Sequence, residues 1–226
     1  KAVMALLKRV KAAKEAGRDV SEITLVGASK MNDADACRQA IAAGIDVLGE
    51  NREQEMTKKL AEHAYDGAPL HFIGHLQRNK VKNVVGKVAM IESVGSLELL
   101  SAIDKQAEKL GIVQDILLEV NIGGEEAKSG FAPESLEQAA EEAKKCANVR
   151  VRGLMCIPPV AEGEHGSLPY FEKVYALFVD INAKLYDNTL DILSMGMSGD
   201  YEDAVRAGAT MVRVGTAIFG ARNYTN

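Results

Sequence analysis

Short apolar runs alternate with amphipathic segments along almost the whole chain, and this alternation constrains the fold more than any other feature of the sequence. Eight runs are typical of buried strands, at residues 23–29, 45–48, 70–73, 88–91, 115–122, 150–156, 191–194 and 211–214. Helical patterns lie between them, at residues 33–43, 52–64, 96–110, 133–146, 168–185 and 200–207. Strands that alternate with helices form βαβ units, and such units build a parallel sheet.

The number and size of these units favour a closed barrel. Eight units in about 200 residues match the α/β fold of a single (β/α)8 TIM barrel, here with an additional N-terminal helix from residue 2 to about 16. An open doubly wound sheet is the alternative, but it needs a glycine-rich turn after the first strand, and "GASKMND" is not such a turn. Because no linker-like stretch divides the chain, we expect one domain over residues 1–226.

The composition argues against several classes of function. The 27 Lys and Arg residues against 32 Asp and Glu residues give a net charge of −5, which does not favour nucleic acid or an acidic membrane as a partner. No apolar stretch approaches the roughly 20 residues that span a bilayer, and no segment resembles a signal peptide. Cys37, Cys146 and Cys156 are far apart, which predicts reduced thiols in a cytoplasmic protein without a metal site.

The segments that follow the seventh and eighth predicted strands indicate a phosphate site. In barrels of this kind, phosphate frequently binds to the loops after these two strands. Gly199 and Gly215 allow close approach to the backbone, Ser198 and Thr216 supply hydroxyl donors, and the helix that starts after Gly215 favours an anion. The alternative is that these residues only form tight turns and helix caps, but two such turns at adjacent strand ends favour phosphate.

Lys30, at the end of the first predicted strand, adds an amine across the mouth of the barrel from that phosphate site. A lysine there can form a Schiff base with an aldehyde, and partial burial lowers its pKa from the usual value of about 10.4 toward the neutral amine that this reaction needs. Pyridoxal phosphate combines an aldehyde, an aromatic ring and a phosphate. Arg213 could point inward at the ring nitrogen and keep it unprotonated. The alternatives are a solvated loop position for Lys30 and a salt bridge within the barrel for Arg213.

Several longer motifs are specific to one family. They are "ASK", "GEN…QE", "HFIGHLQRNK", "VNIGGEEAKSG", "RGLMCIPP" and "LSMGMSGDYEDAVRAGATMVRVGTAIFGAR". From about residue 23 to residue 224 the sequence resembles the pyridoxal phosphate homeostasis proteins, single-domain relatives of the N-terminal barrel of alanine racemase. The resemblance implies pyridoxal phosphate on Lys30, with the other cofactor-binding residues being Asn51, Ser194, Met195, Ser198, Gly199, Arg213, Gly215 and Thr216.

The sequence departs from the usual family pattern at a few positions around the barrel mouth. Met31 and Asn32 replace Thr-Lys, Cys156 stands where Thr is common, and Gly95 where Asp is common. These changes leave the shape of the rim open and do not touch the inferred aldehyde or phosphate contacts. The roles of His75 and Gln77 are also open, and His75 could carry a proton or serve as a hydrogen-bonding scaffold.

Three functions fit these residues: a carrier that buffers pyridoxal phosphate in vitamin B6 homeostasis, an amino-acid racemase that depends on this cofactor, and a class I aldolase-like enzyme. Racemisation needs an acid and a base on opposite faces of the α-carbon. In alanine racemase a tyrosine from a second domain and a second subunit supplies one of them. The sequence ends at Asn226, just after the barrel, and none of its six tyrosines falls at a convincing strand end. We therefore predict a monomeric carrier without strong turnover, with pyridoxal phosphate-dependent apoenzymes as candidate recipients.

Overall fold

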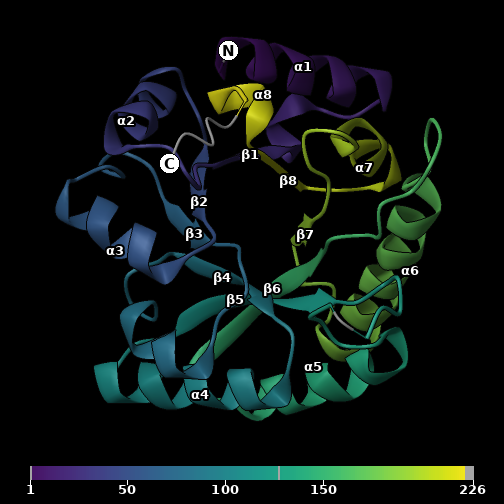
Figure 1. Cartoon of the computed structure of the whole chain (residues 1–226). Helices are drawn as coiled ribbons and strands as arrows, with labels where there is room; N and C mark the ends of the chain where they lie inside the picture. Colours follow the sequence, from purple (N-terminus) through teal and green to yellow (C-terminus); the bar gives the residue numbers. More distant parts are fainter. Residues whose placement is uncertain (1, 127, 222–226) are drawn as a thin grey trace.

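The computed structural model describes residues 2–126 and 128–221, in which eight parallel strands close into a barrel (Figure 1). The strands are β1 (Thr24–Ala28), β2 (Val47–Glu50), β3 (Leu70–Phe72), β4 (Met90–Val94), β5 (Gln114–Val120), β6 (Val149–Cys156), β7 (Ile192–Ser194) and β8 (Met211–Val214). Each strand pairs with the next in the chain, and β8 pairs with β1. The predicted (β/α)8 barrel is therefore confirmed. The predicted resemblance extends to residue 224, and its last residues, 222–224, lie outside the described part.

Helices surround the barrel and connect successive strands (Figure 1). They are α1 (Ala2–Glu15), α2 (Ala34–Ala42), α3 (Glu53–Ala61), α4 (Leu97–Leu110), α5 (Leu136–Lys145), α6 (Leu168–Leu185), α7 (Tyr201–Ala207) and α8 (Thr216–Phe219). The described residues also form the 3-10 helices η1 (Val20–Glu22), η2 (Arg78–Asn83) and η3 (Pro133–Ser135). The sequence pattern indicated no helix between the third and fourth strands, where η2 forms.

The predicted additional N-terminal helix is α1, which packs beside α7 and α8 (Figure 1). Arg9 on α1 pairs with Asp46, and Asp46 Oδ2 accepts a hydrogen bond of 2.8 Å from the Leu25 N–H on β1. Arg18 Nη1 donates to the Val205 carbonyl on α7 at 3.0 Å. The Arg9 contact ties α1 to the start of β1 through Asp46, and the Arg18 contact ties the segment after α1 to α7.

The strands β2 and β4 begin and end later in the chain, and so nearer the barrel mouth, than the apolar pattern predicts. The pattern placed them at residues 45–48 and 88–91, whereas β2 ends at Glu50 and β4 ends at Val94. Glu50, Glu92 and Ser93 are buried within these strands. A hydrophobicity pattern stops at such polar residues, but the strand continues because each side chain has a hydrogen-bond partner inside the protein.

Away from the mouth, the barrel interior is packed by apolar side chains. Val26, Val47 and Met211 form one small cluster, and Met90, Leu117 and Met155 form another. Ile192 packs against both. Nearer the mouth, charged and polar side chains replace them, so the barrel is a filled core with polar chemistry at one end. In the described ranges no helix combines the length and the apolar composition needed to cross a membrane.

Candidate functional site

Lys30 lies half-buried in the turn that directly follows β1. The Asn32 N–H donates to the Ser29 carbonyl at 3.0 Å and closes the turn, and Asn32 Nδ2 donates to the Lys30 carbonyl at 3.1 Å. Met31 has φ +64°, a left-handed conformation that costs a non-glycine residue roughly 1–2 kcal/mol. The turn therefore needs outside contacts to hold it, and it fixes where the Lys30 side chain leaves the backbone.

A buried group of polar side chains lies behind this turn, and we call Ser29, Glu50, Glu55, Lys59 and Tyr65 the Glu50 cluster. Glu50 Oε1 accepts hydrogen bonds from Lys59 Nζ and Tyr65 Oη, both at 2.8 Å, and from Ser29 Oγ. Lys59 Nζ also lies 2.8 Å from Glu55 Oε1. Burial alone would lower the pKa of Lys59, but the charge and hydrogen bond of Glu50, together with the hydrogen bond of Glu55, raise it above its ordinary value. Lys59 is thus a charged ammonium group held inside the protein, whereas Lys30 lies in the half-buried turn at the barrel mouth.

A second buried group lies inside the barrel, and we call His71, Glu92, Ser194 and Arg213 the Glu92 cluster. His71 Nδ1 lies 2.8 Å from Glu92 Oε2, and Ser194 Oγ donates to Glu92 Oε1 at 2.6 Å. Arg213 Nη1 donates to Ser194 Oγ, and Nη2 donates to the Cys156 carbonyl at 2.9 Å. These contacts, from β3, β4, β6 and β7, show that Arg213 on β8 points into the barrel. Its Nη1 also lies 4.0 Å from Glu92 Oε1, so the alternative of an ion pair within the barrel is part of the geometry.

Two carboxyl groups that interact with the charge of Arg213 have opposite pKa shifts. Burial alone would raise the pKa of Glu92, but the hydrogen bond and charge of His71, the charge of Arg213 and the hydrogen bond from Ser194 together lower it. Burial raises the pKa of Glu119, and the charge of Arg213 offsets this only in part. Glu92 is therefore the carboxylate that holds the arginine in place.

The turns after β7 and β8 lie against each other and beside the end of β1. The Gly215 N–H donates to Ser198 Oγ at 3.3 Å, and a Cβ placed on Gly215 would lie 3.3 Å from the Ala28 carbonyl oxygen. A Cβ placed on Gly199 would meet no atom within 4 Å, so the backbone there is open to approach. Thr216 is exposed as the first residue of α8. The structure thus brings together the two turns that were predicted to bind phosphate.

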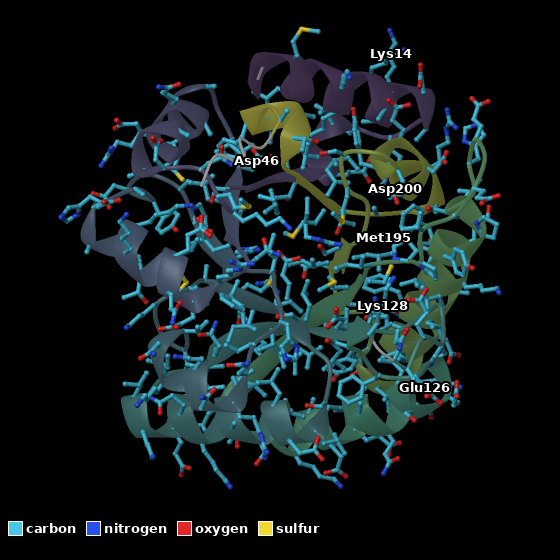
Figure 2. All side chains as sticks on the ribbon, in the orientation of Figure 1. Lys14, Asp46, Glu126, Lys128, Met195 and Asp200 are labelled. Atoms are coloured by element: carbon cyan, nitrogen blue, oxygen red, sulfur yellow. The ribbon has the colours of Figure 1, made fainter. Side chains whose placement is uncertain are left out.

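The remaining predicted pocket residues differ in their surroundings. Asn51 directly follows β2, and its Oδ1 is buried without a hydrogen-bond partner among the described residues, which leaves an acceptor for a ligand. Ser194 and Met195 are fully buried, and the Ser194 hydroxyl is already bonded to Arg213 and Glu92. Figure 2 shows Met195 on the same side of the barrel as Asp200, near β7 and α7. Direct contact of Ser194 or Met195 with a ligand stays a prediction.

His75 is exposed, and its Nδ1 lies 3.2 Å from Ser129 Oγ in the loop after β5. That loop also carries Glu126 and Lys128 (Figure 2). His75 borders a cavity of about 550 Å³ at the ends of β3, β4 and β5. The hydrogen bond agrees with a scaffold role, and a role in proton transfer stays a prediction.

The groups at the barrel mouth fit pyridoxal phosphate. The mouth combines a lysine amine, an arginine that points inward, two turns with hydroxyl groups and accessible backbone, and the buried Asn51 acceptor. An aldehyde suits the amine, and a phosphate suits the turns.

Most residues of the two clusters were not predicted as site residues: Ser29, Glu50, Glu55, Lys59, Tyr65, His71 and Glu92. His71 and Glu92 stand within otherwise apolar strand segments, "LHF" and "MIESV", and an isolated polar residue in such a segment was the available signal. Glu55 is the last residue of the "GEN…QE" motif, but Glu55 and Lys59 have the i, i+4 spacing of an ordinary exposed ion pair on a helix, so the sequence did not show that Lys59 is buried.

Comparison with known proteins agrees with this geometry. The family model of the alanine racemase N-terminal domain matches residues 5–223. The pyridoxal phosphate homeostasis protein of Aquifex aeolicus is 44% identical over 220 residues, covering 97% of this chain and 96% of the relative. The one from Pseudomonas aeruginosa is 42% identical, covering 94% and 90%.

Solved structures give the same result. The structure of PipY from Synechococcus elongatus with pyridoxal phosphate bound has a TM-score of 0.82 and 31% identity, covering 95% of this chain and all of PipY (100%). An alanine racemase from Clostridium difficile has a TM-score of 0.72 and 18% identity, covering 98% of this chain and 57% of the racemase, a likeness that shows the fold alone.

The closed barrel with its lysine after β1 and its paired turns after β7 and β8 is the barrel of the alanine racemase N-terminal class. Within that class, the chain belongs to the family of pyridoxal phosphate homeostasis proteins, which confirms the resemblance read from its motifs.

Proposed function

We propose that this protein holds pyridoxal phosphate as a Schiff base on Lys30, and that it buffers and carries the cofactor without strong catalytic turnover. The main support is the position of Lys30, half-buried in a fixed turn after β1, whose last residue, Ala28, lies beside Gly215 in the turn after β8. PipY, a relative at 31% identity, has pyridoxal phosphate bound. The cofactor supplies an aldehyde when bound. The Lys30 nitrogen bonds to the aldehyde carbon, and the aldehyde oxygen leaves as water.

The other residues of the mouth have separate roles in this proposal. Ser198, Gly199, Gly215 and Thr216 bind the phosphate through their hydroxyl groups and accessible backbone. Arg213 faces the pyridine nitrogen and keeps it unprotonated, which makes the ring a weaker electron sink. The rest of the pocket consists of Asn51, Ser194 and Met195.

Chemical trapping tests the attachment site. Borohydride reduction of the yellow protein, followed by peptide mass analysis, should place the pyridoxyl group on Lys30. The Lys30→Ala variant should lose the visible absorbance and still fold, because a residue at the rim contributes little to the core. A pyridoxyl group on Lys59 or any other lysine would contradict the assignment. A colourless protein that turns over a sugar phosphate would favour the aldolase alternative.

The absence of strong turnover separates a carrier from a racemase. Because Arg213 keeps the ring nitrogen unprotonated, bound amino acids should lose their α-protons only slowly. Proton NMR in heavy water with alanine and other amino acids measures this exchange. Rates on the order of 1 per second or faster would favour the racemase.

The proposal includes three further properties: a single domain over residues 1–226, a monomeric state and a cytoplasmic location. Cys37, Cys146 and Cys156 are all free thiols, which agrees with that location. Apoenzymes that depend on pyridoxal phosphate are the proposed recipients. Light scattering measures the oligomeric state, and activation of an apoenzyme by the loaded protein measures the transfer.

A further inference from the structure

We propose that Lys59 and Glu55, two residues of α3, position Lys30 by holding the backbone on both sides of it. The inference rests on the proposed attachment of the cofactor to Lys30. It assigns to α3 the task of fixing where that amine lies. Both are positioning residues, because they act on the backbone that carries Lys30.

The contacts form a closed path around Lys30. On one side, Lys59 Nζ donates to the Ser29 carbonyl at 2.8 Å. On the other side, Glu55 Oε1 accepts a hydrogen bond from the Met31 N–H at 2.5 Å. Lys59 Nζ and Glu55 Oε1 lie 2.8 Å apart, which joins the two sides. We call Glu55 and Lys59 the α3 clamp.

The α3 clamp is anchored from behind. The Lys59 side chain is 5% exposed, and Glu50 Oε1 lies 2.8 Å from its Nζ. Tyr65 Oη binds the same carboxylate oxygen, which limits the freedom of the Glu50 carboxylate. Since the Lys59 ammonium has three fixed oxygen partners, it can hold the Ser29 carbonyl in one place.

The turn needs such support. Met31 has φ +64°, and a methionine in that conformation relaxes toward negative φ when its contacts are removed. Relaxation at Met31 would move the Lys30 side chain. A displacement of about 1 Å at a reacting group can cost roughly 100-fold in reactivity, so the α3 clamp should affect Schiff-base formation far more than binding of the rest of the cofactor.

Two ligands separate a positioning role from a structural one. Pyridoxal phosphate can bond to Lys30, whereas pyridoxine 5′-phosphate carries an alcohol in place of the aldehyde and cannot. The affinity for pyridoxine 5′-phosphate therefore reports on the ring and phosphate contacts alone. The variants are Glu55→Ala and Lys59→Met. The matched controls are Gln54→Ala and Lys58→Met, which change exposed neighbours on the same helix.

We expect Glu55→Ala and Lys59→Met to weaken pyridoxal phosphate binding by about tenfold or more, and to leave the affinity for pyridoxine 5′-phosphate within about twofold. The controls should change neither. Glu55→Gln, which keeps an oxygen acceptor for the Met31 N–H, should recover part of the loss. If Lys59→Met does not fold, Glu55→Ala decides the result alone, since the Glu55 side chain is 22% exposed and tolerates truncation better.

Equal weakening of both ligands, or no weakening of either, would overturn the α3 clamp. The proposed function itself would be overturned if the Lys30→Ala variant bound pyridoxal phosphate as tightly as the unmodified protein. If Lys30→Ala loses the cofactor while Glu55→Ala and Lys59→Met retain it fully, only the α3 clamp is wrong.

Discussion

The Glu50 and Glu92 clusters are built on the same chemistry but act on different parts of the barrel mouth. Each has a fully buried glutamate that accepts hydrogen bonds from several donors. Glu50 takes its cation, Lys59, from a helix outside the barrel, and this cation holds a backbone turn. Glu92 takes its partners from barrel strands and holds a cation, Arg213, that points inward. The outer cluster therefore positions the amine, and the inner cluster positions the group proposed to face the ring.

Removing the cation of the outer cluster should produce the largest effect. Lys59→Met leaves the buried Glu50 carboxylate without its ammonium partner, and breaking a buried ion pair from one side costs about 3–5 kcal/mol of unfolding free energy. Adding Glu50→Gln to this variant removes the unpaired charge and should recover part of the loss. Urea denaturation at pH 7 measures both. A loss below about 1 kcal/mol would mean that the outer cluster contributes little to stability.

Changes in the turns after β7 and β8 should have a smaller effect, and one of a different kind. Ser198→Ala or Thr216→Ala should each weaken cofactor retention by roughly 1–3 kcal/mol, the range for a lost hydrogen bond to a charged group. Gly215→Val should do more, because its side chain would crowd the Ala28 carbonyl. Titration should show equal losses for pyridoxal phosphate and pyridoxine 5′-phosphate. Unchanged affinity in all three variants would mean that the phosphate binds elsewhere.

The sequence predicted the barrel well, because alternation of strands and helices depends on local patterns that eight repeats reinforce. It also selected Lys30, Ser198, Arg213 and Gly215, which the structure brings to one end of the barrel. These residues could be found because they follow or occupy strand ends, where barrels of this kind carry their chemistry.

The two buried clusters could not be predicted in the same way. Lys59 and Glu55 look like a solvent-exposed helical pair, and only the packing of α3 against the end of β1 shows that Lys59 is buried. Glu92 interrupts an apolar strand, but the sequence does not show that His71 and Ser194 come from other strands to meet it. Contacts between distant segments depend on the closed barrel, so they appear only once the fold is known.

The smallest effect should be that of Glu119, one of two carboxyl groups that interact with the charge of Arg213. The pKa of Glu92 is lowered in the folded protein, so its stabilisation is present above the unfolded pKa of about 4.3 and is lost as the pH falls through the folded value. The pKa of Glu119 is raised, so its stabilisation is present below about pH 4.3 and is lost as the pH rises through the folded value. The two groups therefore have opposite effects on stability at neutral pH.

Substitution by glutamine should expose this opposition. At pH 7, Glu92→Gln should cost about 1.5–3 kcal/mol, because it removes the charged acceptor for Ser194 and the partner of His71. Glu119→Gln should stabilise the protein by up to about 1 kcal/mol, because it removes a charge that burial disfavours. The cost of Glu92→Gln should shrink as the pH falls below about 4.3, whereas the gain from Glu119→Gln should shrink as the pH falls from the raised folded pKa toward about 4.3. Urea denaturation at several pH values from about 3.5 to 7 measures both changes in unfolding free energy, because this range includes the unfolded pKa of glutamate. Destabilisation by Glu119→Gln comparable to that by Glu92→Gln would show that both carboxylates hold Arg213.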